Sequence, residues 1–252
     1  MEPEELDRAV RAAADALAGA RRVAVLSGAG ASAESGVPTF RAADGLWEGH
    51  RVEEVASPEG FAADPDLVHD FYDARRAALD RVEPNAAHRA LGLLERRWRD
   101  EDRGDVVLVT QNVDDLHDRA GSSDLLHMHG TLRTAWCLAC DAHPEWTGST
   151  NGAACPSCGA VALRPDVVWF GEVPRGLDRI DRALRRVDVF VSVGTSGAVH
   201  PAASFVQYAL SRRAHTVELN LAPSEGSWLF RDSRLGPATR LVPTWVEEML
   251  DR

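Results

Sequence analysis

The chain has 252 residues, of which 44% are hydrophobic, and its formal net charge is −11. All 28 basic residues are arginine and none form a block, which argues against sequence-independent binding to nucleic acid. No apolar run approaches the ~20 residues that span a bilayer, and the acidic start Met1–Glu5 lacks a signal-peptide pattern. We therefore expect a cytoplasmic protein without a membrane partner, whose acidic surface favours basic protein partners. The oligomeric state stays open.

Apolar runs alternate with helical patterns along most of the chain. The expected helices are Glu4–Ala18, Pro84–Arg99, Leu177–Arg185, Pro201–Ser211 and Pro243–Leu250. The expected strands are Val23–Leu26, Val106–Thr110, Asp166–Phe170, Val187–Val193 and Thr216–Asn220. This order predicts an α/β fold, a Rossmann-like doubly wound parallel sheet with helices on both faces.

Two segments interrupt the alternation. Short helical patterns broken by prolines fill residues 41–88, and residues 131–165 hold turn formers and all four cysteines. We expect these two insertions to form a small helical and metal-binding domain. The larger Rossmann-like domain would then comprise residues 1–40, 89–130 and 166–252.

The cysteines form two C-x-x-C pairs with 14 residues between the pairs. In a chain without a secretory signal, this spacing favours metal binding over disulfides. Two disulfides or free core cysteines are the alternative. We expect one structural Zn²⁺ in a closed tetrahedral site. Its ligands would be Cys137, Cys140, Cys155 and Cys158.

The segment Gly28–Arg41 reads GAGASAESGVPTFR and follows an apolar strand. A strand that runs into a glycine-rich turn and a helix is how parallel sheets bind pyrophosphate. The extension AESGVPTFR resembles the NAD-binding signature of the sirtuins, the NAD-dependent protein lysine deacylases. This resemblance implies NAD as a consumed co-substrate. It assigns NAD contacts to Gly28, Ala29, Gly30, Ser32, Glu34, Gly36, Phe40, Arg41 and Trp47.

Polar residues follow the strand that ends at Thr110, where ligands bind in open α/β sheets. A loop with Asn and Asp in turn roles is the alternative. The run Gln111–Asp114 matches the Gln-Asn-x-Asp motif of the sirtuins. The resemblance implies that Asn112 orients the nicotinamide ribose and that Asp114 holds the carboxamide.

His129 precedes a glycine between this motif and the first C-x-x-C pair, as in the His-Gly pair of the sirtuins. The resemblance makes His129 the general base, a role that suits an imidazole at neutral pH. His127, two residues earlier, is the competing candidate and lacks a following glycine.

Later turns complete the expected NAD site by resemblance. The turn Gly194–Ser196, with Thr195 at its centre, resembles a second NAD-contacting turn. Asn220, Leu221 and Ala222 follow the next strand and would reach the adenosine ribose, although Ala222 replaces a common acidic residue. Ala238 would close over the adenine through its backbone.

Tyr72 and Arg75 share one face of an expected helix, where an exposed arginine beside a half-buried tyrosine would be ordinary. A Tyr-x-x-Arg pair here resembles the sirtuin subgroup that removes succinyl and malonyl groups. In that subgroup the arginine pairs with the acyl carboxylate and the tyrosine hydroxyl adds a hydrogen bond, and Arg76 would point away. The substrate peptide would add along Val168, Trp169, Phe170 and Gly171.

The resemblance implies a deacylase acting on acylated lysine in proteins. The acyl oxygen attacks the ribose carbon that bears nicotinamide, nicotinamide leaves, and His129 accepts a proton from a ribose hydroxyl. Free lysine and O-acyl-ADP-ribose are the products. Three alternatives stay open: a protein mono-ADP-ribosyltransferase, an NAD-dependent dehydrogenase that would use Glu48, and a non-enzymatic zinc-ribbon module.

Overall fold

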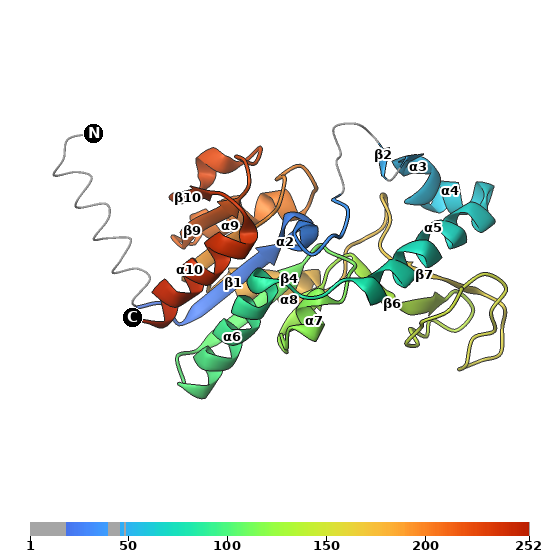
Figure 1. The fold of residues 1–252 in the computed structure, drawn as a ribbon, viewed down its shortest axis with the longest axis horizontal. Helices are drawn as coiled ribbons and strands as arrows, with labels where there is room; N and C mark the ends of the chain where they lie inside the picture. Colours follow the sequence, from blue (N-terminus) through green and yellow to red (C-terminus); the bar gives the residue numbers. More distant parts are fainter. Residues whose placement is uncertain (1–18, 40–45, 48, 252) are drawn as a thin grey trace.

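The computed structural model describes residues 19–39, 46–47 and 49–251. The predicted helix Glu4–Ala18 lies outside these ranges. A six-stranded parallel sheet in the order β10-β9-β8-β1-β4-β5 forms the centre of the larger lobe (Figure 1). Its strands are β1 (Arg22–Ser27), β4 (Asp105–Thr110), β5 (Leu125–His127), β8 (Val189–Val193), β9 (His215–Asn220) and β10 (Asp232–Leu235).

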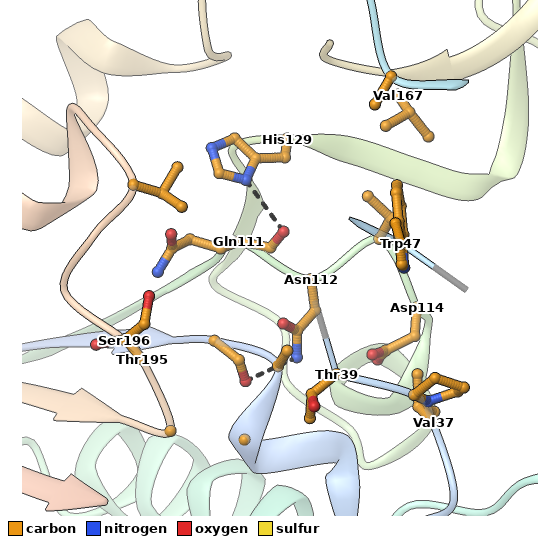
Figure 2. A pocket seen from close by; sticks show the side chains of 18 of the residues that line it. Val37, Thr39, Trp47, Gln111, Asn112, Asp114, His129, Val167, Thr195 and Ser196 are labelled. Carbon is orange, nitrogen blue, oxygen red and sulfur yellow. Dashed lines mark hydrogen bonds between the residues drawn. The ribbon is translucent and has the colours of Figure 1, made fainter. Parts of the chain in front are cut away.

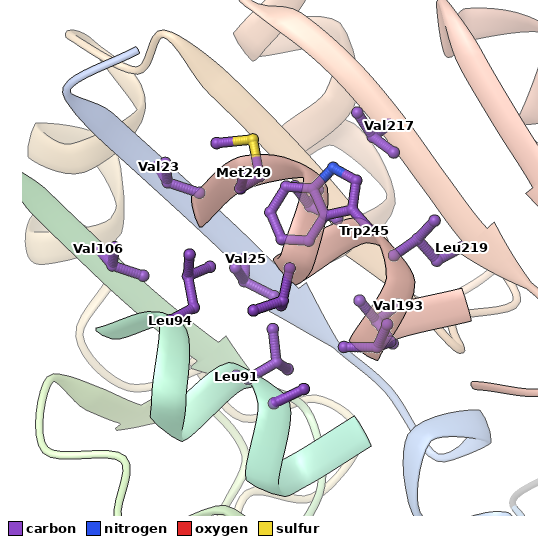
Figure 3. Close-up of a cluster of buried hydrophobic side chains, with 14 of the residues drawn as sticks. Val23, Val25, Leu91, Leu94, Val106, Val193, Val217, Leu219, Trp245 and Met249 are labelled. Atoms are coloured by element: carbon purple, nitrogen blue, oxygen red, sulfur yellow. The ribbon is translucent and has the colours of Figure 1, made fainter. Parts of the chain in front are cut away.

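Helices cover both faces of this sheet, as the sequence predicts. On one face, α6 (Ala86–Asp100) and α10 (Ala238–Leu250) pack over β1, β4, β8 and β9 around Leu91, Leu94 and Trp245 (Figure 3). On the other face, α8 (Leu177–Leu184) and α9 (Phe205–Ser211) bury Phe190 and Phe205. None of the helices in the described ranges is long and apolar enough to cross a membrane.

The chain order places the switch point of the sheet between β1 and β8. From β1 the chain proceeds to β4 and β5 on one side, then crosses to β8, β9 and β10 on the other. The loops after β1 and β8 therefore leave toward opposite faces and open a crevice at the carboxyl ends of the strands. The glycine turn follows β1 at this point, and Gly194 follows β8.

A smaller lobe lies beyond these loop ends (Figure 1). Its helices are α3 (Val52–Val55), α4 (Pro58–Ala63), α5 (Pro65–Ala78) and the 3-10 turn η2 (Leu79–Arg81). The paired strands β2 (Leu46–Trp47) and β3 (His50–Arg51) precede them, and β6 (Gly130–Cys137) pairs antiparallel with β7 (Leu163–Val167). A buried cluster joins α5 to β6 and to the loop after β7 through Tyr72, Leu132 and Trp169.

The remaining short elements connect these parts. They are α2 (Gly30–Ala33), α7 (Leu116–Arg119), η3 (Ala202–Ser204) and η4 (Ser227–Leu229). Caps fix the helix starts, since Asp64 accepts from the Leu67 N–H at the start of α5 and Asn85 caps α6.

The structure corrects two expected elements. The strand predicted over Asp166–Phe170 is wrong in extent and partner, because β7 ends at Val167 and pairs with β6 rather than with the main sheet. The last helix begins at Ala238 and runs through Pro243, which the sequence placed at its start. Proline is frequent in the first turn of helices, so its position misled the prediction.

Candidate active site

A cavity of about 730 Å³ lies between the carboxyl ends of the sheet strands and the smaller lobe (Figure 2). Its size and its mixture of apolar and polar walls suit a ligand larger than a simple metabolite. Many of the predicted site residues line it: Gly28, Ala29, Gly30, Gly36, Trp47, Tyr72, Arg75, Gln111, Asn112, Asp114, His129, Val168, Trp169, Phe170, Gly171, Gly194, Thr195, Ser196, Asn220, Leu221 and Ala222.

The glycine turn shapes this cavity through close backbone packing. The Gly28 N–H donates to the Val193 oxygen and the Gly30 N–H to the Gly194 oxygen, both over 2.9 Å. A Cβ atom on Gly30 would come within 2.7 Å of the Gly194 Cα. The N–H groups of Ala31 and Ser32 also have backbone acceptors. These four N–H groups are therefore already bonded and are not free to hold a pyrophosphate. The glycines instead let the loops after β1 and β8 meet.

The Ser32 hydroxyl lies beneath the cavity and joins two polar residues of its wall. It donates to the Asp114 carboxylate over 2.8 Å and accepts from the Asn112 amide over 3.1 Å. The Asn112 amide also donates to the Gly28 oxygen over 3.1 Å. Burial raises the pKa of Asp114, although the bond from Ser32 opposes this. These bonds fix the orientation of the Asn112 amide and the Asp114 carboxylate in the cavity wall.

His88, which the sequence analysis missed, supports Ser32 from behind. Its Nδ1 accepts from the Asn85 N–H over 3.2 Å, so Nε2 carries the proton and donates to the Ser32 hydroxyl over 3.2 Å. Burial lowers the pKa of His88 to about 4. The His117 ring packs edge-on against His88 and bonds to Ser27 over 2.8 Å. The only sequence signal was the capping pattern of Asn85 and His88.

The structure separates the two candidate histidines. His129 lines the cavity, and its Nδ1 lies 3.2 Å from the Gln111 carbonyl oxygen. A carbonyl can only accept, so Nδ1 carries the proton and the Nε2 lone pair is left to accept another. Burial lowers the pKa of His129, which keeps the ring neutral at pH 7.

His127 has a different environment. Its Nε2 lies 3.0 Å from Asp118 and its Nδ1 lies 3.3 Å from the Asn112 oxygen. Burial lowers the pKa of His127, but the bond to Asp118 and its charge outweigh burial and raise it overall. His127 therefore binds its proton more tightly than a free imidazole and is bonded at both nitrogens, which does not suit a general base.

Aromatic residues and one arginine form the cavity wall in the smaller lobe. Tyr72 is fully buried and packs against the rings of Trp47, Phe71 and Trp169. The Arg75 guanidinium carbon lies 3.1 Å from the centre of the Phe71 ring, and its Nη1 donates to the Phe71 oxygen over 2.6 Å. Arg75 thus brings a positive charge to an apolar wall.

Arg76 points away from the cavity, as expected. It is 1% exposed and donates to the Leu132 and Gly148 oxygens while pairing with Asp73. The two adjacent arginines of α5 therefore differ in surroundings: Arg75 lines the cavity and Arg76 binds α5 to β6.

The segment Val168–Gly171 lines the cavity as a loop, not as the expected strand edge. The Val168 N–H donates to the His129 oxygen over 2.8 Å, and the Phe170 N–H to the Ala56 oxygen over 2.9 Å. These bonds attach the loop to both lobes.

Three predicted contact residues do not line the cavity. Ser32 is buried beneath it. The Glu34 carboxylate accepts from the N–H and hydroxyl of Thr239, at the start of α10. Ala238 is buried in the core that α10 shares with α6. Phe40 and Arg41 lie outside the described residues.

Two further turns close the cavity at the switch point. The Asn220 amide donates to the Thr195 oxygen over 2.7 Å, which joins the loops after β8 and β9. Lining residues that the sequence analysis did not select include Val37, Pro38, Thr39, Val113, Glu172, His200, Ser224 and Glu225. Pro38 and Thr39 lie within the glycine motif Gly28–Arg41, so the motif itself could have predicted that they line the cavity.

The four cysteines converge at the end of β6 and the loop that follows. Their sulfur atoms all lie within 4.8 Å of one another. Cys137 and Cys158 are 3.7 Å apart and Cys140 and Cys155 are 3.8 Å apart, far longer than a disulfide bond. Zn–S bonds of about 2.3 Å in a tetrahedron separate the sulfurs by about 3.8 Å. The four thiolates are placed to bind one zinc ion, and they leave no ligand position for water.

The sequence and the structure both match one known family. A family model described as "Sir2 family" matches residues 28–201. An "NAD-dependent protein deacylase" of Shigella flexneri is 53% identical over 91% of this chain and 84% of its own length. One of the same name from Vibrio vulnificus is 51% identical over 91% of this chain and 94% of its own.

Solved structures agree with these relatives. A Sir2 homologue in complex with NAD has a TM-score of 0.85 and 38% identity, over 96% of this chain and 94% of its own. Sir2Af2 bound to a myristoylated histone peptide has a TM-score of 0.71 and 30% identity, over 96% of this chain and 97% of its own. The chain therefore belongs to the Sir2 family, the sirtuins.

Proposed function

We propose that this sirtuin is an NAD-dependent protein-lysine deacylase that prefers acyl groups ending in a carboxylate, such as succinyl and malonyl. One observation carries the proposal. The partly buried, neutral His129, the Asn112 and Asp114 pair, and the cationic Arg75 all line the same cavity. The relatives named NAD-dependent protein deacylase support the general activity.

The polar end of the cavity supports binding of the nicotinamide ribose. NAD supplies a ribose carbon whose bond to nicotinamide breaks during transfer of the ADP-ribosyl group. Asn112 offers an amide held by Ser32 and the Gly28 oxygen, and Asp114 offers a carboxylate that can accept from a carboxamide. The Nε2 atom of His129 accepts the proton of a ribose hydroxyl, because Nδ1 already donates to Gln111.

The aromatic end supports binding of the acyl group. Its walls bury the methylene carbons of an acyl-lysine, while Arg75 supplies the charge that a terminal carboxylate needs. A guanidinium carries five N–H donors, so the bond to Phe71 is compatible with a bidentate pair to a carboxylate. An acetyl group lacks that carboxylate and gains nothing from Arg75.

The partner we propose is an acylated lysine in a protein, in line with neighbours solved with acylated or deacetylated peptides. The loop Val168–Gly171 would contact the peptide chain. The four reduced cysteines and the acidic chain support action in the cytoplasm, where thiols stay reduced.

The test replaces Arg75 by methionine, which keeps the length and apolar stem of the side chain. Truncating one partner of a buried charge pair costs about 2 kcal/mol or more, so kcat/KM for a succinyl-lysine peptide should fall at least about 30-fold. The value for the matched acetyl-lysine peptide should change by less than about threefold. Arg81→Met, at the exposed end of η2, removes the same charge outside the cavity wall and is the matched control. Equal losses on both peptides would refute the role of Arg75.

A further inference from the structure

A hydrogen bond joins Tyr72 and Trp169, two polar aromatic side chains at the aromatic end of the cavity. The Trp169 Nε1–H donates to the Tyr72 hydroxyl over 3.1 Å, and the two side chains are 2% and 0% exposed. An indole N–H can only donate, so the phenolic oxygen must accept. The proton of Tyr72 is therefore turned away from Trp169. Among the described residues this is the one hydrogen bond of that hydroxyl, and Tyr72 lines the cavity.

Three further contacts fix Trp169 in place. Its main-chain N–H donates to Glu172 Oε2 over 2.8 Å. The Arg164 guanidinium binds Glu172 through two bonds of 2.7 and 2.9 Å and covers the Trp169 ring, with its carbon 3.5 Å from the ring centre. Phe61 packs on the ring at 5.2 Å. The indole has little freedom to rotate, so its N–H has a fixed direction.

We propose that Trp169 is a specificity-determining residue that acts through Tyr72. By occupying an acceptor position of the phenol, it directs the Tyr72 proton toward the carboxylate of a bound succinyl or malonyl group. The inference rests on the proposed function, since it needs an acidic acyl group beside Arg75. Trp169 is thus a positioning residue, in addition to any contact of its loop with the peptide.

Two physical effects support this role. A hydroxyl that already accepts a hydrogen bond becomes a stronger donor, because chains of hydrogen bonds polarise one another. Burial also raises the pKa of Tyr72, which keeps the phenol protonated and able to donate to an anion. With phenylalanine at position 169 the hydroxyl would be free to rotate, and part of its population would present a lone pair to the carboxylate.

A double-mutant cycle tests the proposal on matched succinyl-lysine and acetyl-lysine peptides. The proteins are the wild type, Trp169→Phe, Tyr72→Phe and the double variant. We expect Trp169→Phe to lower kcat/KM for the succinyl peptide by about 5- to 10-fold. Any loss that the acetyl peptide shares reflects contact of the loop with the peptide chain, so the quantity compared is the succinyl loss relative to the acetyl loss. In the Tyr72→Phe background the same change should add no further loss, because the hydroxyl it acts on is gone.

A matched control separates this effect from loss of stacking. Trp136 lies under the same guanidinium, 4.7 Å from its carbon, but its N–H donates to Asp141 and it does not line the cavity. Trp136→Phe should leave the ratio of the two activities unchanged. Equal losses on both peptides, or the same loss with and without the Tyr72 hydroxyl, would overturn the role of Trp169. A wild-type enzyme without any succinyl preference would instead overturn the proposed acyl selectivity itself.

Discussion

The Nδ1 atom of His129 lies 3.2 Å from the main-chain oxygen of Gln111, the residue that precedes Asn112. This bond fixes the tautomer of the proposed base and ties its ring to the loop that carries Asn112 and Asp114. The bond therefore fixes the position of the His129 ring relative to the residues proposed to hold the ribose. The first two predictions follow from this geometry.

Replacing His129 by alanine should abolish turnover without unfolding the protein. General base catalysis contributes about 10²- to 10⁴-fold, so kcat should fall by at least about 100-fold. Nicotinamide release measures the rate, and thermal unfolding checks the fold. His127→Gln is the comparison, since that ring is bonded to Asp118 away from the cavity, and its kcat should change far less. A folded His129→Ala enzyme with substantial turnover would disprove the assignment.

The pH dependence of catalysis should reflect the environment of His129. Burial lowers its pKa below the usual 6.5, so the ring stays neutral and able to accept a proton somewhat below that pH. We expect kcat/KM for the wild type to be level from pH 7 to 8 and to fall as one proton binds, with a midpoint below 6.5. A midpoint above 6.5 would mean that a neighbouring charge, not burial, governs this histidine.

Stability should fall as the pH is lowered through the range in which free histidine titrates. Burial lowers the pKa of His88 to about 4 and also lowers that of His117, so the unfolded chain binds more protons than the native state below pH 6.5. The contribution of these two neutral histidines to the free energy of unfolding is then complete above pH 6.5 and is lost as the pH falls toward 4. For His88, the difference between a pKa of 6.5 in the unfolded chain and about 4 in the native state corresponds to about 3 kcal/mol of the free energy of unfolding.

Urea unfolding at several pH values measures this effect. The free energy of unfolding should depend less on pH between 6.5 and 4.5 in His88→Asn than in the wild type. His200→Asn is the control, because His200 is exposed, and its pH dependence should match the wild type. Identical slopes in all three proteins would show that His88 does not contribute.

Metal removal should unfold the cysteine segment and leave the larger core folded. The cluster around Cys137 and Cys155 buries only Ala135 and Leu163 besides the thiols, which is little to fold a segment without a metal. Elemental analysis should find about one zinc per chain. Cys155→Ser should lose the metal and become sensitive to proteolysis within residues 138–161. A zinc-free protein with unchanged proteolysis and melting would contradict a structural ion.

The sequence predicted the features that depend on local pattern. Buried strands such as Val23–Leu26 and Val106–Thr110 appear as continuous apolar runs, and the C-x-x-C spacing alone indicated a metal cluster that the structure confirms. The glycine motif also lies at the switch point of the sheet, where a doubly wound fold binds ligands.

Contacts between residues far apart in the chain could not be predicted from the local sequence pattern. The pairing of β7 with β6 joins residues from Cys137 and Leu163 to Gly130 and Val167, which lie 26 to 37 positions apart, and the polar edge strand β10 carries no apolar run. His88 and Ser32 meet only because α6 packs beside the glycine turn, 56 residues apart in the chain. Glu34, expected on the ligand, instead bonds to Thr239 at the start of α10.

The most direct test of the account is NAD-dependent deacylation of two matched peptides, one with succinyl-lysine and one with acetyl-lysine, followed by mass spectrometry of peptide, nucleotide and protein. We predict free lysine, nicotinamide and O-acyl-ADP-ribose from both, with higher kcat/KM for the succinyl peptide. A preference for acetyl-lysine would contradict the role of Tyr72 and Arg75. Absence of turnover on both peptides, or ADP-ribose left on the protein target, would contradict the deacylase itself.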